Sequence, residues 1–288
     1  EELERMPVNP DFQLGLRINP IVKTGVPDVY DVSHDESKFG VPITEREKIL
    51  DAILRFPVTL LHVHSGSQMA NIDSATDGIC LLRDIAIEAN ILLLSRGISR
   101  RIKTLDIGGG LMPEELEMSE TSMMEKYVSN LRLRCQELWE FELITEFGQW
   151  SYFFSGYAIS KIEYSIQKGD KYITYIHIGA DFLLRDSYVK PRGIAFGITD
   201  SSFQWKTTKK VSHDIAGPLC FAGDYLAKNV LLPQAEETDI MILAGTGSNS
   251  YGLWSRHCSR AIPLFLAVDY EKKKVEKLST RLEAFQNF

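Results

Sequence analysis

Short apolar runs in the first half of the chain are separated by longer segments in which apolar residues recur every three or four positions. This rhythm predicts strands that alternate with helices. A loop is predicted to reach Thr44, whose capping box with Glu47 begins the first helix, and Gly97 is predicted to end the second. The predicted strands cover residues 12–18, 58–63, 102–107 and 141–145, and the predicted helices cover residues 44–56, 74–95 and 124–138. This order is that of a parallel α/β sheet or of part of a (β/α) barrel.

The pattern changes after about residue 160, where apolar and polar residues alternate over short runs. Alternation with a period of two predicts strands, and the turn at residues 168–171 predicts a β-hairpin over residues 162–178. Further strands are predicted at residues 193–197, 213–216, 239–243 and 261–269, and the charged run 271–277 is predicted to be a solvated turn. We therefore expect two domains: residues 1–158, which combine strands and helices, and residues 159–288, a mainly antiparallel β domain.

Composition narrows the class of ligand. The chain of 288 residues is 44% hydrophobic and 25% charged, and its net charge is −7. An acidic chain without an extended basic cluster is not expected to bind nucleic acid or an anionic membrane, so a small molecule is the better candidate ligand. No apolar run reaches the roughly 18 residues that a membrane span needs. The four cysteines lack the spacing of a zinc site or a disulfide framework, which predicts free thiols, no metal site and a cytoplasmic location. Cys80 and Cys135 are predicted to lie in the core.

Residues that could bind a ligand or take part in a reaction follow the ends of the four predicted strands. In parallel sheets the carboxyl ends of the strands form the active face, so these residues are expected to lie together. Three adjacent glycines leave backbone N–H groups that an anion such as phosphate can approach closely. His62 shares a side of its strand with His64 but lies deeper, and it is predicted to be structural. The candidates are Arg17, His64 with Ser67, Gly108–Gly110, and Glu146.

An ordered set of motifs connects these candidates: RINP from Arg17, SKFG, HVHSGSQ from His62, LDIGGGL, EFGQ from Glu146, and GPLC followed by GD. The set resembles the fold-type III pyridoxal-phosphate decarboxylases, which include the ornithine, diaminopimelate and arginine decarboxylases, and its wording is most similar to that of the diaminopimelate decarboxylases. The resemblance implies the C-terminal half of an alanine-racemase-like (β/α)8 barrel, with its last four strands, followed by a mainly antiparallel β domain. The implied cofactor is pyridoxal 5′-phosphate.

The same resemblance assigns roles to the residues of the first half. His64 is expected to stack on the pyridine face of the cofactor, and Ser67 and the amides of Gly108–Gly110 to hold its phosphate. Glu146 matches the acidic residue that keeps the pyridine nitrogen protonated, so that the ring accepts the electron pair left when the substrate loses carbon dioxide. Arg17 is expected to lie near the cofactor.

For the second half, the resemblance implies residues that act on the amino-acid substrate. Arg185 matches the arginine that binds the substrate carboxylate. Cys220 matches a cysteine that reaches the active site of a partner subunit and protonates the reaction's carbanion, and Asp224 is expected to shape its loop. Catalysis of this kind implies a homodimer with shared active sites.

Three departures from the family pattern alter these expectations. Gln149 stands where the family usually has an arginine that helps to bind phosphate, so affinity for the phosphate should fall. Phe221 replaces an acidic residue that meets the distal amine of the substrate, so an amino acid with an uncharged end is expected rather than ornithine. The family's phosphate-binding tyrosine has no certain match, and either Asn249 or Tyr251 fills its position.

The lysine to which the family attaches its cofactor lies before the RINP motif, whereas the first lysine of this chain is Lys23. We therefore expect a fragment of a longer polypeptide, inactive without the preceding segment. Two functions remain open: a pyridoxal-phosphate-dependent amino-acid decarboxylase, and a non-catalytic homologue that binds the cofactor or a protein partner. The motif around Cys220 disfavours a racemase on the same barrel.

Overall fold

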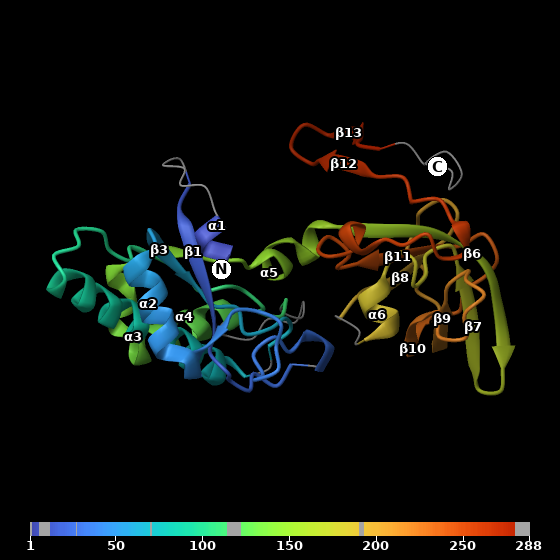
Figure 1. The fold of residues 1–288 in the computed structure, drawn as a ribbon. Coiled ribbons are helices and arrows are strands. Elements are labelled where there is room, and N and C mark those ends of the chain that lie inside the picture. The colour runs from blue at the N-terminus through green and yellow to red at the C-terminus, as the bar shows by residue number, and fades with distance from the viewer. Residues whose placement is uncertain are drawn as a thin grey trace. The chain divides into compact units, whose positions relative to one another are not determined.

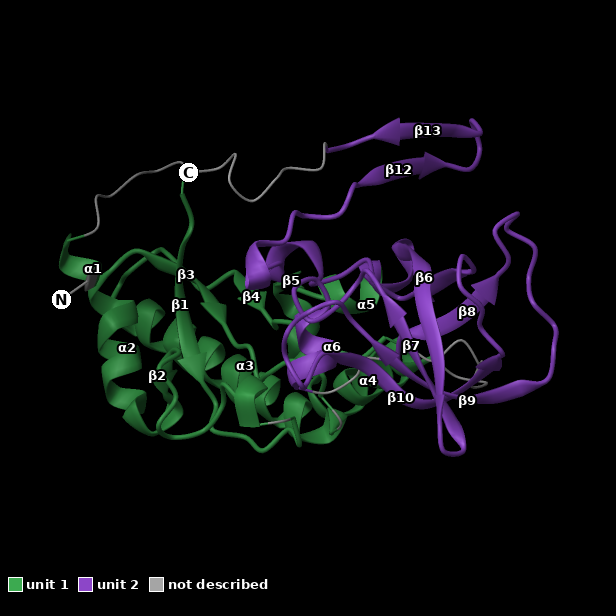
Figure 2. Ribbon diagram, turned by 90° about the vertical axis from the view of Figure 1, so that its right-hand side faces the viewer, with its two compact units in different colours: residues 1–151 green, residues 152–288 purple. Residues whose placement is uncertain are grey.

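The computed structural model describes residues 2–5, 12–26, 28–69, 71–113, 122–189 and 193–279. They belong to two compact units, residues Glu1–Ser151 and Tyr152–Phe288, which Figure 2 shows in different colours. Each unit has its own hydrophobic core. Within the described part of the chain, every helix is too short or too polar to span a membrane.

The first unit is built on a parallel sheet with the strand order β2-β1-β3-β4-β5 (Figure 1). The four predicted strands are present, each ending within two residues of its predicted limit. The prediction of a continuous loop up to Thr44 is wrong, because this segment contains a fifth strand, β2, that pairs in parallel with the end of β1. A two-residue strand has no periodicity to detect, and its Pro42 has no N–H to donate. The strands are β1 (Leu14–Asn19), β2 (Val41–Pro42), β3 (Val58–His62), β4 (Thr104–Asp106) and β5 (Glu142–Ile144).

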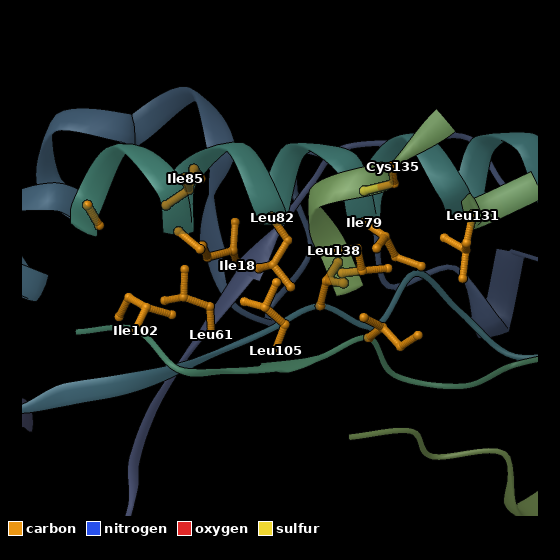
Figure 3. Packing of buried hydrophobic residues seen from close by; sticks show 14 of the residues in the cluster. Ile18, Leu61, Ile79, Leu82, Ile85, Ile102, Leu105, Leu131, Cys135 and Leu138 are labelled. Carbon is orange, nitrogen blue, oxygen red and sulfur yellow. The ribbon is translucent and has the colours of Figure 1, made fainter. Parts of the chain in front are cut away.

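The helices of this unit are shaped by one dominant apolar face. Helix α3 (Ile72–Ser95) buries residues at spacings of three and four, and Figure 3 shows Ile79, Leu82 and Ile85 pointing toward Leu61 and Leu105 of the sheet. Burial of each such side chain contributes about 1.5–3 kcal/mol. The other helical segments of the unit are α1 (Glu2–Arg5), η1 (Asp28–Tyr30), η2 (Ile43–Glu45), α2 (Arg46–Arg55), α4 (Met123–Arg134) and η3 (Gln136–Glu140).

The sequence predicted the end of α3 and the start of α2. Gly97 follows the C-cap of α3 with a φ of +71°, the left-handed conformation that suits glycine at this point. The capping box of Thr44 and Glu47 is wrong, because the chain enters α2 through the 3-10 turn η2. The N-cap is therefore Glu45, and it makes no side-chain capping hydrogen bond.

The second unit contains a six-stranded sheet with the order β10-β9-β7-β6-β11-β8, in which only β7 and β9 pair in parallel. The predicted hairpin is confirmed as β6 and β7. Strand β10 was missed because Lys228 and Asn229 interrupt its apolar pattern at a register shift. The strands are β6 (Tyr157–Lys168), β7 (Lys171–Ile176), β8 (Ala195–Thr199), β9 (Lys210–Ala216), β10 (Tyr225–Pro233) and β11 (Ile240–Ala244).

A separate two-stranded ribbon follows, formed by β12 (Leu266–Asp269) and β13 (Lys274–Lys277). The solvated turn predicted over residues 271–277 is correct only in its first part, because its second part pairs with β12. All four residues of β13 are exposed, so its charged sequence carries no apolar signal. Short helical segments complete the unit: η4 (Phe153–Ser155), α6 (Leu184–Tyr188), η5 (Tyr251–Leu253) and η6 (His257–Ser259), with α5 (Gly148–Tyr152) at the junction of the two units.

Candidate active site

The register of the parallel sheet brings the predicted strand ends to one edge. Arg17 on β1 is opposite His62 on β3, which is opposite Asp106 on β4, which in turn is opposite Ile144 on β5. Because the strands are parallel, the segments that follow them leave the sheet at the same edge. The candidate residues of the first unit therefore lie on neighbouring chain segments.

The glycine run fills a space that admits no side chain. A Cβ on Gly108 would lie 2.5 Å from the carbonyl oxygen of Val63, and one on Gly110 would lie 2.0 Å from that of Gly66. A Cβ on Gly109 would lie 2.3 Å from the carbonyl oxygen of Glu146. Every one of these obstacles is backbone, which cannot rotate away. The close approach of three chain segments thus explains why three adjacent glycines are needed.

Two of the three glycine amides already have acceptors. The N–H of Gly108 donates to Asp106 Oδ1 at 2.9 Å, and that of Gly109 donates to His64 Nδ1 at 3.2 Å. The N–H of Gly110 has no acceptor among the residues that the structure describes. Capacity for an anion is therefore concentrated at Gly110, whereas the sequence had suggested all three amides.

His64 is neutral. Because Nδ1 accepts the hydrogen bond from Gly109, the ring proton is on Nε2. Burial and the nearby charge of Arg17 lower the pKa of His64 to about 4. The distance of 3.4 Å between His64 Nδ1 and Glu146 Oε2 is thus a contact of a neutral ring with a carboxylate rather than an ion pair. A neutral imidazole at this edge suits packing against an aromatic ligand.

Arg17 connects two of the sequence motifs. Its guanidinium lies over the ring of Phe39, 4.6 Å from the centroid, and Nη2 lies 3.5 Å from the carbonyl oxygen of His64. Burial lowers the pKa of Arg17, while Glu146 and Asp106 oppose that change. An arginine pKa lies so far above neutrality that the side chain keeps its charge. Arg17 therefore supplies positive charge at the edge that carries His64.

His62 and Asp106 join this edge, although neither was predicted to belong to the site. One nitrogen of His62 and one oxygen each of Asp106 and Glu146 lie within 4.8 Å of one another. His62 Nε2 is 3.8 Å from Glu146 Oε2 and has no hydrogen-bond partner in the described structure. Burial lowers the pKa of His62. An imidazole and two carboxylates are a donor set that suits a divalent cation or a relay of protons. The signal was available, because both new residues end strands of the same parallel sheet.

Buried polar atoms without partners mark the same edge. Gln68 is 4% exposed, and neither its side-chain oxygen nor its nitrogen has a partner in the described structure. Gln149, 8% exposed, has an unpartnered Nε2 in that same part of the chain. Buried polar groups are normally paired, so orphaned ones indicate a ligand or ordered water. Gln68 is a residue that the sequence reasoning missed, although it closes the HVHSGSQ motif; Ser67 beside it is half-buried.

The candidates of the second unit lie on its loops. Cys220 is exposed, and its sulfur is 3.2 Å from that of Cys258. Phe221 stacks on Tyr188 with ring centroids 5.0 Å apart and planes inclined by 10°. Asp224 is buried and accepts hydrogen bonds from the N–H groups of Ala180 and Leu219, both at 2.7 Å.

The remaining candidates occupy different surroundings. Arg185 lies on α6, three residues before Tyr188, and is half-buried. Tyr251 is exposed and meets Phe265 edge to face at 4.7 Å. Asn249 is exposed and has a φ of +55°. Neither residue is distinguished by its local contacts as the substitute for the family's tyrosine.

Comparison with known proteins agrees with the arrangement of strands and motifs. Residues 1–152 match the sequence model of the family described as "Pyridoxal-dependent decarboxylase, pyridoxal binding domain". A diaminopimelate decarboxylase of Aquifex aeolicus is 24% identical over 258 residues, which cover 86% of this chain and 57% of that protein. One of Helicobacter pylori is 26% identical over 276 residues, which cover 94% of this chain and 65% of that protein. The chain therefore spans 57% and 65% of the length of these two relatives.

Solved structures share the fold. The crystal structure of diaminopimelate decarboxylase from Helicobacter pylori complexed with L-lysine matches with a TM-score of 0.78 at 23% identity, over 95% of this chain and 65% of that one. The arginine decarboxylase of Paramecium bursaria Chlorella virus bound to agmatine matches with a TM-score of 0.67 at 16% identity, over 85% and 62% of the two chains. The predicted resemblance is confirmed.

Proposed function

Because the chain belongs to the pyridoxal-dependent decarboxylase family, we propose that the protein of which it forms part removes the carboxyl group of an amino acid with pyridoxal 5′-phosphate as cofactor. The observation that carries this proposal is the strand-end edge of the first unit. There, a glycine run without room for side chains lies beside a neutral His64 and the carboxylate of Glu146. We further propose that this unit is the C-terminal half of a (β/α)8 barrel and that the domains are residues 1–158 and 159–288.

The residues at this edge fit the cofactor. Two features leave hydrogen-bonding groups available for a ligand: a Gly110 amide without an acceptor in the described structure, and the orphaned polar atoms of Gln68 and Gln149. The neutral ring of His64 beside them suits an aromatic ligand. When bound, the cofactor supplies an aromatic ring that accepts the electron pair of the broken bond.

In this proposal the amide of Gly110 and the hydroxyl of Ser67 bind the phosphate. His64 packs its neutral ring on the pyridine face, where the absence of charge avoids competition for the electrons of the ring. Glu146 would accept a hydrogen bond from the protonated pyridine nitrogen, and His62 Nε2 lies 3.8 Å from its carboxylate. Arg17 adds positive charge beside His64. Gln149 offers the phosphate an amide in place of a guanidinium, so its contribution is weaker than in the family pattern.

For the second unit we propose roles in substrate binding and protonation. Arg185 binds the substrate carboxylate, and the thiol of Cys220 delivers a proton to the carbon that lost its carboxyl group. By the resemblance, this delivery takes place in the active site of a partner subunit, which implies a homodimer. Asp224 holds the loop of Cys220 through its hydrogen bond from Leu219.

The substrate is proposed to be an amino acid without a positive charge at its distal end. Phe221 and Tyr188 form a stacked aromatic pair that presents no carboxylate to an amine. A site that leaves an ammonium group unpaired excludes it at a cost of several kcal/mol. The proposed substrate therefore differs from diaminopimelate, the substrate that the names of the two sequence relatives imply for those proteins.

The second candidate is a non-catalytic homologue that binds the cofactor or a protein partner. Gln149, Phe221 and the hydrogen bond that already engages the amide of Gly109 favour it. The two candidates predict different behaviour of the full-length polypeptide when it is saturated with pyridoxal phosphate.

A test begins with the visible absorbance of the full-length protein with the cofactor, before and after borohydride reduction, followed by carbon dioxide release from a panel of amino acids. The decarboxylase reading expects a borohydride-sensitive band and release from an uncharged amino acid. Release should fall by about a hundredfold or more in Glu146→Gln, where the side chain loses its charge but keeps its size. A bound cofactor without release from any member of the panel would establish the non-catalytic homologue.

A further inference from the structure

Cys220 and Cys258 are the two exposed cysteines of the chain, and they lie next to each other although 38 positions separate them. Their sulfur atoms are 3.2 Å apart, close enough for one thiol to donate a hydrogen bond to the other. Both belong to the second unit. A disulfide needs a sulfur separation of about 2.05 Å, so the pair has to close by roughly 1 Å.

The backbone around the two thiols is fixed by one shared segment. Asp224, on the loop of Cys220, accepts a hydrogen bond from the N–H of Ala180 at 2.7 Å. Asp181, which follows Ala180, accepts a hydrogen bond at 3.0 Å from Nε of Arg260, and Arg260 lies two residues after Cys258. Both carboxylates are buried, with exposures of 3% and 4%. The two cysteine loops are therefore anchored to adjacent residues of the same turn, and the proximity of the thiols does not depend on flexible side chains alone.

Aromatic contacts join the same loops a second time. Phe221, next to Cys220, stacks on Tyr188 and lies with its ring centroid 6.1 Å from that of His257, the neighbour of Cys258. Tyr188 Oη is 3.5 Å from His257 Nδ1. These contacts connect the neighbours of both cysteines to each other and to Tyr188.

The backbone at Cys258 has an unusual conformation. Cys258 and Ser259 have φ angles of +56° and +55°, which L-residues other than glycine seldom adopt. Such a conformation is unfavourable and persists where its surroundings determine it. Here the N–H of Ser259 bonds to the carbonyl of Arg256 at 2.8 Å, and Arg260 bonds to the carbonyl of His177 at 2.7 Å. The turn thus holds Cys258 beside Cys220 at a cost in backbone energy.

We propose that Cys220 and Cys258 form a reversible oxidative modification site, at which a hydroperoxide converts the two thiols into an intramolecular disulfide. The sulfur of one cysteine attacks an oxygen of the peroxide, an S–O bond forms as the O–O bond breaks, and water or an alcohol leaves. The second sulfur then attacks the first, the S–S bond forms, and water leaves. The sulfurs give up two electrons, which reduce the peroxide. A small dithiol reverses the reaction by thiol–disulfide exchange.

The consequence for activity rests on the proposed function. If Cys220 donates the proton that completes decarboxylation, the disulfide removes that proton and the enzyme stops. A disulfide that forms only under oxidising conditions is compatible with a reducing compartment, where such bonds are transient and act as sensors.

The other two cysteines provide the control. The pKa of Cys80 is lowered to about 7, chiefly by its hydrogen bond with Cys135, which makes Cys80 the competing thiol to control for. Cys135 is completely buried in the core of the first unit, so any disulfide of this pair would have to begin with oxidation of Cys80. The two pairs are therefore distinguished by mapping the disulfide, and Cys80→Ser should leave the bond between Cys220 and Cys258 unchanged.

The test treats the reduced full chain with one equivalent of hydrogen peroxide, alkylates the remaining thiols and analyses a tryptic digest by mass spectrometry. A disulfide is expected between the peptides 211–228 and 257–260, which carry Cys220 and Cys258, and dithiothreitol should release it. Cys258→Ser should abolish this linked species. Alkylation of both cysteines at the level of untreated protein, or links between two Cys220 residues of different chains, would overturn the proposal.

Activity is measured separately on the full-length protein, so that the two proposals fail independently. Peroxide is expected to reduce carbon dioxide release by about tenfold or more in the wild type. Cys258→Ser, which leaves the proposed catalytic thiol in place, cannot form the disulfide, so its loss of activity after the one-equivalent treatment should be smaller than that of the wild type. A mapped disulfide without any decarboxylase activity would refute the proposed function and leave the modification site standing. A mapped disulfide that leaves activity unchanged would refute its effect on catalysis.

Discussion

An alanine at Gly109 separates steric effects from backbone strain in the glycine run. Gly108 and Gly110 have positive φ angles, so any side chain there meets an unfavourable backbone conformation as well as an obstacle. The φ angle of Gly109 is not positive, and alanine can adopt its conformation. The effect of Gly109→Ala therefore reports the contact with the segment of Glu146.

The size of this effect follows from the obstacles. The added methyl group would lie 2.3 Å and 2.7 Å from the carbonyl oxygen and carbon of Glu146, and 3.3 Å from the nitrogen of Phe147. Each distance must grow to the usual 3.4 Å or more, so the backbone after β5 has to move by roughly 1 Å. Overpacking of this kind costs about 1–3 kcal/mol, against a gain of about 0.4–1 kcal/mol from the stiffer unfolded chain. The same displacement moves the carboxylate that is proposed to bind the pyridine nitrogen.

The assay combines urea unfolding with titration of pyridoxal phosphate, followed by the quenching of tryptophan fluorescence. Gly109→Ala is expected to lower the free energy of unfolding by about 1–2 kcal/mol and the affinity for the cofactor by about tenfold. Gly148→Ala is the matched control, because nothing lies within 4 Å of its added methyl group and its φ is not positive. Equal cofactor affinities of the two variants would show that the segment of Glu146 does not take part in binding.

Three further changes test other residues of the site. Burial and Arg17 lower the pKa of His64 from 6.5 to about 4, so its contribution to stability is complete above pH 6.5 and is lost as the pH falls toward 4. Between pH 7 and pH 5, urea unfolding should show that the free energy of unfolding falls by about 2 kcal/mol, and by less in His64→Gln. An equal fall in the variant would contradict the burial argument. Gln149→Arg restores a guanidinium and should raise the affinity for pyridoxal phosphate by about tenfold in the fluorescence titration, whereas unaltered affinity would remove Gln149 from the phosphate site. Phe221→Glu should increase carbon dioxide release from ornithine relative to an uncharged amino acid, and rapid turnover of ornithine by the wild type would refute the role of Phe221.

The fold was predictable wherever a segment was long enough to show a period. Helix α3 and the hairpin of β6 and β7 have apolar residues at regular spacings, and both were found within a few residues. Strands β2 and β13 were missed because one has two residues and the other has a charged sequence without a buried side chain. Their pairing depends on partners elsewhere in the chain, which local periodicity does not report.

The candidate site was predictable to the extent that strand ends converge in a parallel sheet. That rule located Arg17, His64 and Glu146 on neighbouring segments, but it was not applied to Asp106, the last residue of β4. The sequence also did not predict that His62 would lie beside Asp106 and Glu146, because alternation along a strand gives the side on which a side chain lies but not which neighbours it reaches. Partners of individual amides, such as His64 for Gly109, depend on three-dimensional contacts and left no pattern in the sequence.

The hydrogen bond from Gly109 to His64 links the two ends of the proposed cofactor site. As long as His64 Nδ1 accepts from Gly109, the ring is neutral and fixed, and the amide is occupied. An anion that took the amide of Gly109 would release Nδ1, which could then accept a proton and pair with Glu146 at 3.4 Å. Binding of a phosphate through the amide of Gly110 and the hydroxyl of Ser67, as proposed, leaves this bond intact and the ring of His64 neutral. If the phosphate binds without the amide of Gly109, as we propose, it depends on fewer donors than a site that uses all three glycine amides, and His64 Nδ1 keeps the acceptor role that holds its ring neutral.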